Sequence, residues 1–434
     1  MLAHVFDRSR RKPAVTDRTP PAWVPAPIRR LAITRPELSG AFADLGLLIP
    51  LEASLIAING LNPTSTLLGV GIFYVAAGWY FRIPMPVQPL KALAALAIAE
   101  RLSPDVIAAG ALLMSLSLAF LAVTGLIDRL YRIIPTAIVR GTQLGLAYIL
   151  IRGAVRMLER PLTPGAPTAS LAYGSIDVPV MLALAPIVLL GMFVLVKKPL
   201  VPASIAVLVC GVAVGLALNP DALAGLRFGP ERVALRAPEL NAFSTAAALL
   251  LTAQLPLTIA NSVVATADTA AAYFPGSSAR VTPRRLSLSI ALGNLWAGFA
   301  GGLPVCHGSG GLTAHYSFGA RRPLSTAITG LTLIAVALMF GHAVLVVRHV
   351  VPLPFFGLLL LFVGIQHARL AMDIQGTLDR GFVVLTGVLA VVFDGNLAYA
   401  AIAAMAAYWL VRNDVIERAA RSLFGSRRAD VTQP

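Results

Sequence analysis

The stretch IPMPVQPLK at residues 83–91 interrupts a run of apolar segments with three prolines, and GLPVCHGSGG at residues 302–311 interrupts a second run with one proline and four glycines. Each interruption is followed by only about 10–15 apolar residues, whereas a membrane-spanning helix needs about 20. Non-helical backbone at membrane depth is tolerated only where it is buried in protein or lines a watery cavity. A pair of such interruptions at corresponding positions of two halves is typical of the binding site of a secondary transporter.

Composition places the chain in a membrane. It has 434 residues, of which 57% are apolar and 13% are charged, whereas soluble proteins carry about 25% charged residues. The net charge of +15 flanks apolar segments and forms no basic domain interleaved with aromatic residues, so nucleic-acid binding is not expected. Cys210 and Cys306 lie in different apolar segments, which predicts no disulfide framework. We expect no cleaved signal peptide, because no apolar core precedes Gly40.

We interpret the apolar runs as fourteen membrane segments in two sets of seven. They cover residues 39–59, 63–81, 85–100, 103–127, 134–157, 178–196 and 199–218, then 241–266, 286–301, 304–317, 323–346, 351–370, 381–394 and 396–412. Because seven is odd, the second set enters the membrane from the opposite side, which makes the two sets inverted repeats. The fold class is therefore an all-α polytopic membrane protein with 7+7 inverted repeats, whose third and tenth segments are broken.

The domain organisation follows from the same division. It comprises a basic cytoplasmic tail at 1–38, a first repeat at 39–218, an inter-repeat loop at 219–240, a second repeat at 241–412 and a second basic tail at 413–434.

The positions of the basic residues test this count, because Lys and Arg gather in the cytoplasmic loops of membrane proteins. Loops after even-numbered segments hold twelve: Arg82, Arg129, Arg132, Lys197, Lys198, Arg280, Arg284, Arg285, Arg321, Arg322, Arg369 and Arg380. Loops after odd-numbered segments hold seven: Arg101, Arg156, Arg160, Arg227, Arg232, Arg236 and Arg348. We therefore expect a multi-pass protein of the cell (inner) membrane with both termini cytoplasmic. Twelve crossings remain open if short segments merge.

Each interruption would place the start of a half-helix near the bilayer centre. Such a start leaves backbone N–H groups unpaired and carries about half a positive charge, so two facing starts form an anion site. Gly308, Gly310 and Gly311 would let an oxyanion approach the backbone. Gln88 and Ser309 could add neutral hydrogen bonds.

Lys91 is the most informative side chain of the first interruption, because it begins the third apolar segment far from any loop. A cation inside a membrane is costly unless something compensates it, and an anionic substrate would do so. The alternatives are a lysine that extends to the interface and a lysine paired with a structural carboxylate such as Asp44.

Segment eight carries a polar stripe. Gln254, Thr258 and Asn261 are spaced i, i+4 and i+7 and share one helical face, and Asp268 continues roughly along it. In lipid such a face points toward a binding site or toward a neighbouring helix, and both readings stay open. Asp44, Glu100 and Asp268 are the candidates for proton coupling, although Glu100 stands beside Arg101 at a segment end and suits an interfacial position.

His307 follows Cys306 in the second interruption. Adjacent residues cannot supply a closed metal site, and the sequence has no CxxC or HExxH spacing, so neither metal nor cofactor is expected. His307 is then either a substrate-facing histidine or a structural one. Arg140 and Gln143 could line the same cavity or contact lipid headgroups. No nucleophile elbow or phosphate loop is present, so an enzyme is not expected.

Five stretches of the chain resemble the molybdate transporter family that is related to the SulP sulfate permeases. They are SGAFADLGLLIPL (39–51), GLNPTSTLL (60–68), IPMPVQPLKALAALAIAE (83–100), QLPLTIANSV (254–263) and LPVCHGSGGLTAHYSFGAR (303–321). The matches occur in order in both halves of the chain, and the resemblance as a whole covers about 40 to 410. We expect no STAS domain, which typical SulP permeases carry at the C-terminus.

The resemblance implies import of molybdate, a tetrahedral dianion, by alternating access, with the anion held between the two half-helix starts. It also implies a core domain of segments one to four and eight to eleven that moves against a gate domain formed by the others, and it allows a homodimer. The residues implicated in substrate binding are Gln88, Lys91, Gln254, Asn261, His307, Gly308, Ser309 and Gly310.

Two alternatives remain at this stage. Sulfate or another oxyanion could be the substrate, because helix starts recognise charge and shape more than the central atom. A non-transporting oxyanion sensor would bind the anion without moving it across the membrane.

Overall fold

The helices of the computed structural model follow the apolar runs closely. The structure describes residues 34–163, 167–173, 176–195, 203–223, 226–344, 350–372 and 374–412. The residues from Pro36 onward belong to one compact unit. Most of the two basic tails, together with Lys197, Lys198 and Arg348, lies outside the described residues.

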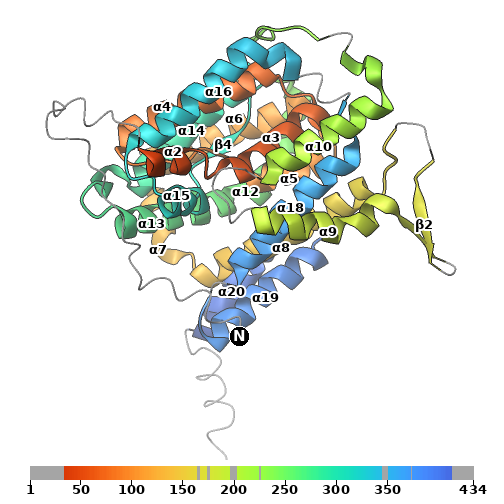
Figure 1. Cartoon of the computed structure of the whole chain (residues 1–434). Coiled ribbons are helices and arrows are strands. Elements are labelled where there is room, and N and C mark those ends of the chain that lie inside the picture. Colours follow the sequence, from red (N-terminus) through yellow and green to blue (C-terminus); the bar gives the residue numbers. More distant parts are fainter. Residues whose placement is uncertain are drawn as a thin grey trace, which may run out of the picture. The chain divides into compact units, whose positions relative to one another are not determined.

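The elements of the first half are α2 (Arg35–Ala41), α3 (Leu45–Asn59), α4 (Pro63–Phe81), β1 (Gln88–Pro89), α5 (Lys91–Ala99), α6 (Pro104–Val123), α7 (Leu126–Ile133), α8 (Thr136–Leu158), β2 (Ser170–Tyr173), β3 (Ile176–Pro179), α9 (Val180–Leu195) and α10 (Ala203–Leu218). A short turn of 3₁₀-helix, η2 (Pro220–Leu223), follows them. They are drawn from red to green in Figure 1.

The elements of the second half are α11 (Leu240–Thr245), η3 (Ala246–Leu251), α12 (Thr252–Leu257), η4 (Thr258–Val264), α13 (Ala265–Tyr273), η5 (Ser278–Arg280), α14 (Pro283–Ala300), β4 (Val305–Cys306), α15 (Ser309–Ser317), α16 (Pro323–Val344), α18 (Leu353–Ala371), α19 (Thr377–Val392) and α20 (Leu397–Arg412). The elements from α11 to α13 run on as one helix, in which η3 and η4 are π-helical.

Helices are present at all fourteen predicted segments, and the molecule is predominantly helical, as the sequence predicts. Within the described residues, four helices are long and apolar enough to cross a membrane by themselves: α4, α6, the helix Leu240–Tyr273 and α16. The number of crossings stays a prediction. The sequence did not predict α7 or the hairpin of β2 and β3, most of whose residues fall in stretches assigned to loops.

Helix starts are marked by a repeated local pattern. Asn62, Ser103 and Thr282 each accept a hydrogen bond from a backbone amide in the first turn of α4, α6 and α14, respectively. In all three helices a proline is the first helical residue, where its missing N–H costs nothing.

Contacts between the two halves occur twice: where a segment of the first half packs on a segment of the second, their counterparts in the opposite halves also pack together. The second segment packs on the eleventh (α4 with α16), and the ninth packs on the fourth (α14 with α6). Likewise α8 packs on α19 and α18 packs on α9, while β1 pairs with β4 and α8 with α18 (Figure 1). The equivalent helices α4 and α14 are antiparallel, since Gly69 faces Trp296 and Phe73 faces Gly293. This arrangement is that of inverted repeats related by a two-fold axis.

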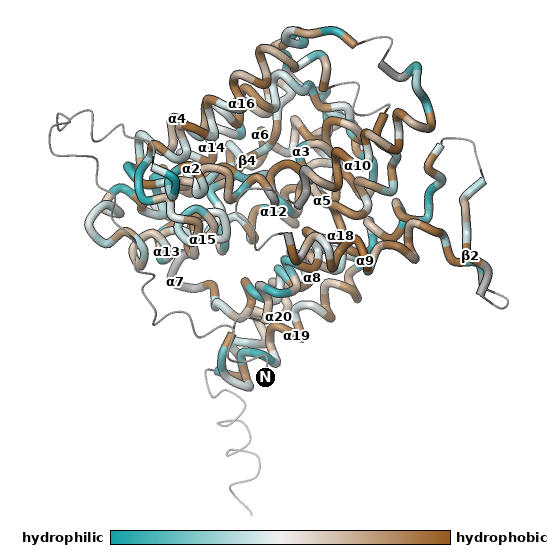
Figure 2. Tube along the Cα trace, in the orientation of Figure 1, coloured by the Kyte–Doolittle hydropathy of each residue, from teal (hydrophilic) through white to brown (hydrophobic). Residues whose placement is uncertain are grey.

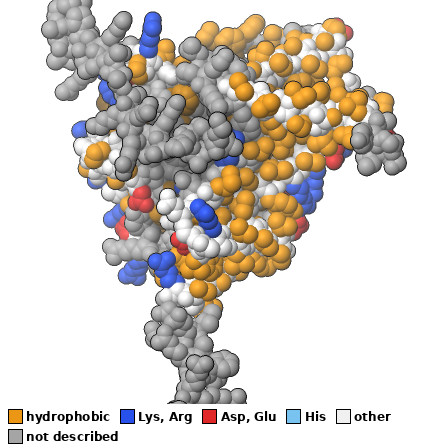
Figure 3. All heavy atoms as spheres, turned by 60° about the horizontal axis from the view of Figure 1, so that its bottom comes forward, with side chains coloured by type: hydrophobic (Ala, Val, Ile, Leu, Met, Phe, Trp, Pro, Cys, Tyr) orange, Lys and Arg blue, Asp and Glu red, His pale blue; other side chains and the backbone are white. Residues whose placement is uncertain are grey.

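The surface suits a lipid environment. Hydrophobic residues follow the tubes of α9, α10 and α18 in Figure 2, and hydrophobic side chains cover much of the face in Figure 3, with charged ones mainly toward its margins. Large apolar side chains such as Trp79, Leu116 and Ile187 are 80%, 70% and 69% exposed. Exposed apolar area of this extent is expected where a protein contacts acyl chains.

Candidate functional site

The two interrupted stretches meet in the middle of the molecule. β1 and β4 pair in antiparallel fashion, with Gln88 opposite Cys306 and Pro89 opposite Val305. The amide of Leu90 donates to Pro304 O at 2.9 Å. The pairing satisfies backbone groups that have left helical geometry, as burial in a membrane protein requires. It also places the first residues of α5 and α15 beside the same short ladder.

The start of α15 is the more open of the two. Its first intrahelical bonds run from Gly311 and Leu312 to Gly308 O, at 3.1 and 3.2 Å. The preceding amides of Ser309 and Gly310 are therefore the ones that a helix leaves without intrahelical partners. Ser309 and Gly310 are partly exposed, and a Cβ built on Gly310 would meet nothing within 4 Å. A small anion could approach this backbone.

Lys91 supplies the positive charge of the site. Its side chain, on the first residue of α5, is only 5% exposed. It forms neither a hydrogen bond nor an ion pair with the described residues. Its ammonium lies 3.3 Å from the position that a Cβ on Gly308 would take. A buried cation therefore lies beside the chain that leads into α15.

Asp44, the residue before α3, orients Gln88. Asp44 is 4% exposed and accepts from Gln88 Nε2 at 2.6 Å and from the Tyr74 hydroxyl at 3.3 Å. Gln88 Oε1 is buried and has no hydrogen-bond partner in the described part of the chain. A Cβ on Gly311 would come within 2.6 Å of Gln88 Nε2 and 2.7 Å of Asp44 Oδ2. Glycine at this position therefore lets α15 approach the pair.

Polar side chains connect α15 to α8. Ser309 Oγ donates to Asn261 Oδ1 at 3.0 Å, and Gln143 Nε2 donates to the same oxygen at 3.5 Å. Arg140 donates in turn to Gln143 Oε1 at 3.1 Å. Asn261 belongs to η4, whereas Arg140 and Gln143 belong to α8. A second positive charge is thus linked to the start of α15.

Gln254 supports α5 and lies at its first turn. Its Oε1 accepts from the amide of Leu93 at 2.9 Å, and its Nε2 donates to Thr258 Oγ1 at 2.8 Å. The side chain satisfies one of the amides that the helix start leaves unpaired. Both polar atoms of the Gln254 side chain therefore have protein partners, and the bond to Leu93 holds the first turn of α5 against α12.

His307 has protein partners on both ring nitrogens. Nδ1 lies 2.8 Å from Pro86 O, and Nε2 lies 2.9 Å from the Ser289 hydroxyl. The ring stacks on Phe73 at 5.0 Å between centroids, and Thr266 donates to His307 O at 2.7 Å. The imidazole thus fastens β4 to α4 and α14. Its contact with substrate stays a prediction.

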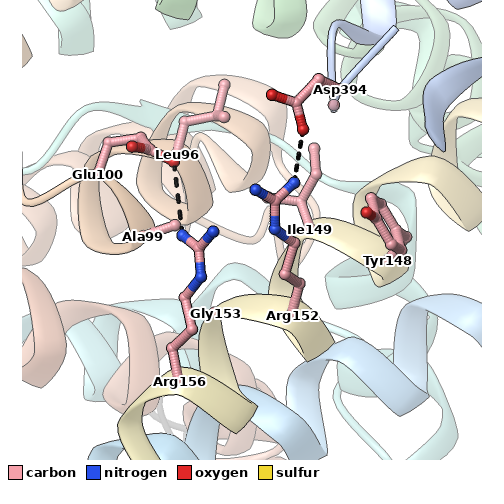
Figure 4. A pocket seen from close by; sticks show the side chains of 10 residues that line it. Leu96, Ala99, Glu100, Tyr148, Ile149, Arg152, Gly153, Arg156 and Asp394 are labelled. Carbon is pink, nitrogen blue, oxygen red and sulfur yellow. Dashed lines mark hydrogen bonds and ion pairs between the residues drawn. The ribbon is translucent and has the colours of Figure 1, made fainter. Parts of the chain in front are cut away.

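Two of the three candidates for proton coupling, Glu100 and Asp268, lie away from the β1–β4 ladder. Glu100 caps the far end of α5, about 13 Å along the helix from Lys91. Its side chain is 53% exposed and lies 4.0 Å from Arg156 of α8. Figure 4 shows this pair beside that of Arg152 and Asp394, which are 2.6 Å apart. Asp268 is exposed on α13, beyond the buried stretch of η4.

Several polar residues near the ladder were not predicted from the sequence. Tyr74 contacts Asp44, and Asn294 of α14 donates to Val305 O at 2.7 Å and accepts from Val305 N at 3.2 Å. Glu52 and His315 are also buried, at 4% and 0% exposure. The available signal was a polar residue inside an apolar run, which marks an inward-facing position.

Known proteins share both the sequence and the fold. The family described as "Molybdate transporter of MFS superfamily" matches residues 36–150 and 246–366. Molybdate transporter 2 of Arabidopsis thaliana is 29% identical over 445 residues, which cover 93% of this chain and 94% of that protein. Molybdate transporter 1 of Chlamydomonas reinhardtii is 26% identical over 479 residues, with 87% and 92% covered.

Solved anion transporters have the same fold. The transmembrane domain of the cyanobacterial bicarbonate transporter BicA superposes with a TM-score of 0.60 at 17% identity, over 85% of this chain and 97% of that domain. Murine solute carrier 26 family member A9, in its inward-facing state, gives a TM-score of 0.62 at 15% identity, over 88% of this chain and 68% of that protein. The resemblance to the SulP-related molybdate transporters is thus confirmed. The chain belongs to the molybdate transporter family, whose members are multi-pass membrane transporters and not enzymes.

Proposed function

We propose that this protein is a secondary active transporter that imports molybdate by alternating access, with the anion held between the starts of α5 and α15. The observation that carries the proposal is Lys91, a buried cation without a carboxylate partner among the described residues, at the junction of two half-helices. The named relatives are molybdate transporters, which favours molybdate among the tetrahedral oxyanions.

The charges around the junction suit a dianion. Each helix start contributes about half a positive charge and Lys91 a full one. Arg140 is linked to Ser309, at the start of α15, by hydrogen bonds through Gln143 and Asn261. A dianion among these groups would compensate a cation that is otherwise costly in a membrane. The open space at Gly310 and the hydroxyl of Ser309 offer backbone and side-chain donors for its oxygens.

Asp44 is the proton-coupling group that we favour among the three candidates. It is buried and contacts Gln88 directly, so protonation of its carboxylate would change the hydrogen bond that orients Gln88. Glu100 and Asp268 are exposed and lie away from the ladder. Coupling to protons would let the inward gradient drive the uptake of an anion.

The remaining proposals concern the setting. We place the protein in the cell (inner) membrane with both termini cytoplasmic, on the charge asymmetry of its loops, and we allow a homodimer. Reporter fusions at each terminus test the orientation, and native mass spectrometry in detergent tests the oligomeric state.

The decisive experiment is molybdate uptake into proteoliposomes, in which the molybdenum retained inside the vesicles is measured by mass spectrometry. We expect saturable uptake by the wild type and at least about tenfold weaker apparent affinity for Lys91→Ala, since a charged contact to an anion contributes 1.4 kcal/mol or more. Arg227→Ala, which removes an exposed cation of the inter-repeat loop, is the matched control and should keep the wild-type affinity.

Competition identifies the substrate. Excess sulfate should inhibit molybdate uptake more weakly than unlabelled molybdate does. Equal or stronger inhibition would favour the sulfate transporter of the same fold. Binding by calorimetry without any uptake or counterflow would favour a sensor, and the absence of both binding and uptake for either anion would overturn the proposal.

A further inference from the structure

An apolar groove runs along α4 and α14. It has a volume of about 630 Å³ and is lined by residues of both helices and by Leu303 and Val305. Of the lining side chains only Arg285 is charged. Ile72 and Leu292 on its walls are 48% and 67% exposed. The groove is thus open along its length and apolar except at one end.

The length of the groove corresponds to one leaflet of a bilayer. Along α14 it extends from Arg285 to Trp296, which is about 16 Å at 1.5 Å per residue. The hydrocarbon core of a bilayer is about 30 Å thick, so one leaflet contributes about 15 Å. Val305, at the inner end, belongs to the strand pair where the half-helices begin. The groove therefore reaches from the membrane surface to the level of the ladder.

The outer end of the groove is basic. Arg285 lines it, and Arg280 donates to Tyr80 O at 3.1 Å and lies 5.9 Å from the centroid of the Tyr80 ring, another lining residue. Arg82 and Arg284, next to these residues in sequence, are exposed. None of the four forms an ion pair with the described carboxylates. An anionic group is the partner that this end lacks.

The charge pattern also identifies the leaflet. The loops that hold these arginines follow the second and eighth segments, which the excess of basic residues places on the cytoplasmic side. Anionic lipids are concentrated in the cytoplasmic leaflet, and basic pockets between helices on that side recognise their headgroups. The basic end, the length of the groove and its leaflet are thus all those expected of a site for an anionic lipid.

We propose that this groove binds one anionic phospholipid, with an acyl chain between α4 and α14 and the phosphate at Arg280 and Arg285. The inner end of the groove touches the residues that fasten β4, since Phe73 stacks on His307 and Ser289 hydrogen-bonds to it. The bound chain therefore packs against the back of the strand pair and supports its position.

Native mass spectrometry of the purified full chain, titrated with phosphatidylglycerol or with phosphatidylcholine of the same acyl chains, tests the proposal. We expect one phosphatidylglycerol to bind in preference to phosphatidylcholine. Replacement of both arginines (Arg280→Ala with Arg285→Ala) should weaken phosphatidylglycerol binding about 30-fold, since each basic group near a lipid surface contributes about a factor of five. The same change at Arg369 and Arg380, two exposed arginines on other elements, is the matched control.

A second variant tests the acyl chain. Ala76→Trp fills the groove with an indole ring and should abolish phosphatidylglycerol binding, whereas Ala335→Trp, on the exposed face of α16, should not. Equal binding of both lipids, or phosphatidylglycerol binding that neither the arginine pair nor Ala76→Trp reduces, would overturn the proposal. These readouts do not depend on molybdate, so they separate the lipid site from the proposed transport function.

Discussion

At the scale of single residues, the junction depends on where a Cβ can and cannot be placed. Gly311 and Gly310 are neighbours in the first turn of α15, yet their surroundings are opposite. A Cβ on Gly311 would lie 2.6 to 2.7 Å from Gln88 Nε2, Asp44 Oδ2 and Pro86 Cβ, whereas one on Gly310 would meet nothing within 4 Å. A substitution at Gly311 therefore tests how tightly α15 packs against its neighbours, whereas one at Gly310 tests whether an anion can reach the start of the helix.

Gly311→Ala should lower the thermal stability and abolish uptake, because overpacking a buried contact costs about 1–3 kcal/mol and would displace α15 from Gln88. Gly310→Ala should keep the wild-type unfolding temperature and weaken molybdate uptake, since its methyl group enters the open space beside the helix start. Thermal unfolding and uptake of both variants are the measurements. Wild-type uptake in Gly310→Ala would show that the anion does not approach this backbone.

Asp44→Asn tests coupling at the same scale. The amide keeps the shape of the carboxylate but cannot release a proton, so uptake driven by an inward proton gradient should fall to the level seen without the gradient. Exchange of labelled for unlabelled molybdate, which needs no net proton movement, should persist. Glu100→Gln is the control and should retain gradient-driven uptake. Its loss in Glu100→Gln, with Asp44→Asn unaffected, would move the coupling role to the far end of α5.

The residues of the junction were partly predictable from the sequence. Lys91, Gln88 and Ser309 were found because each breaks an apolar run close to a helix-breaking residue. The surroundings of His307 were not, since its partners Phe73 and Ser289 come from other helices and only packing brings them to the ring. A sequence pattern shows that a polar group is inside a membrane protein, but it does not show which neighbour satisfies it.

At the scale of elements, β4 is held by a side chain in place of a further strand. β1 is its only strand partner in the described structure, and on the other side Asn294 of α14 bonds both the N–H and the C=O of Val305. The amide side chain mimics the edge of a neighbouring strand. It thereby satisfies both backbone polar groups of Val305 where no further strand of the described chain is paired.

Asn294→Ala should therefore destabilise the protein by about 2–4 kcal/mol, because it leaves two buried backbone groups without partners. We expect a lower unfolding temperature and a loss of molybdate uptake, since β4 leads directly into α15. Asn241→Ala, on the exposed face of α11, is the matched control. A wild-type unfolding temperature in Asn294→Ala would mean that β4 is held by other contacts.

The element boundaries were easier to predict than the course of the eighth segment. The i, i+4, i+7 spacing of Gln254, Thr258 and Asn261 assumes a regular α-helix, but η4 is π-helical and Pro256 removes one backbone donor. Gln254 consequently reaches α5, and Asn261 reaches α15 and α8. Apolar length and turn residues predict where a helix is, whereas a π-turn depends on tertiary packing that the spacing does not encode.

At the scale of the whole molecule, one contact within the first half has no equivalent among the described residues of the second half. α5 packs on α8, but their counterparts α15 and α18 make no comparable contact in the described structure. The ends of α5 and α8 meet at Glu100 and Arg156, beside the loop that holds Asp394 (Figure 4). These ends follow odd-numbered segments, which lie outside the cell in the orientation that we propose. On the proposed orientation, the unequal contacts predict a state closed to the outside.

A disulfide between α5 and α8 should hold the molecule in this state. The position of a Cβ on Gly153 is 3.5 Å from Ala99 Cβ, which is within the separation that disulfides require. In a Cys210→Ser background, oxidation of the Ala99→Cys with Gly153→Cys double variant should stop uptake, and reduction should restore it. Uptake by a variant with either replacement alone should be insensitive to oxidation. Leu150→Cys with Gly364→Cys, whose Cβ atoms would lie 3.2 Å apart, joins α8 to α18 within the proposed gate and should leave uptake intact. Uptake that continues at full rate after complete Ala99–Gly153 cross-linking would show that α5 and α8 do not separate during transport, and alternating access would then need another moving boundary.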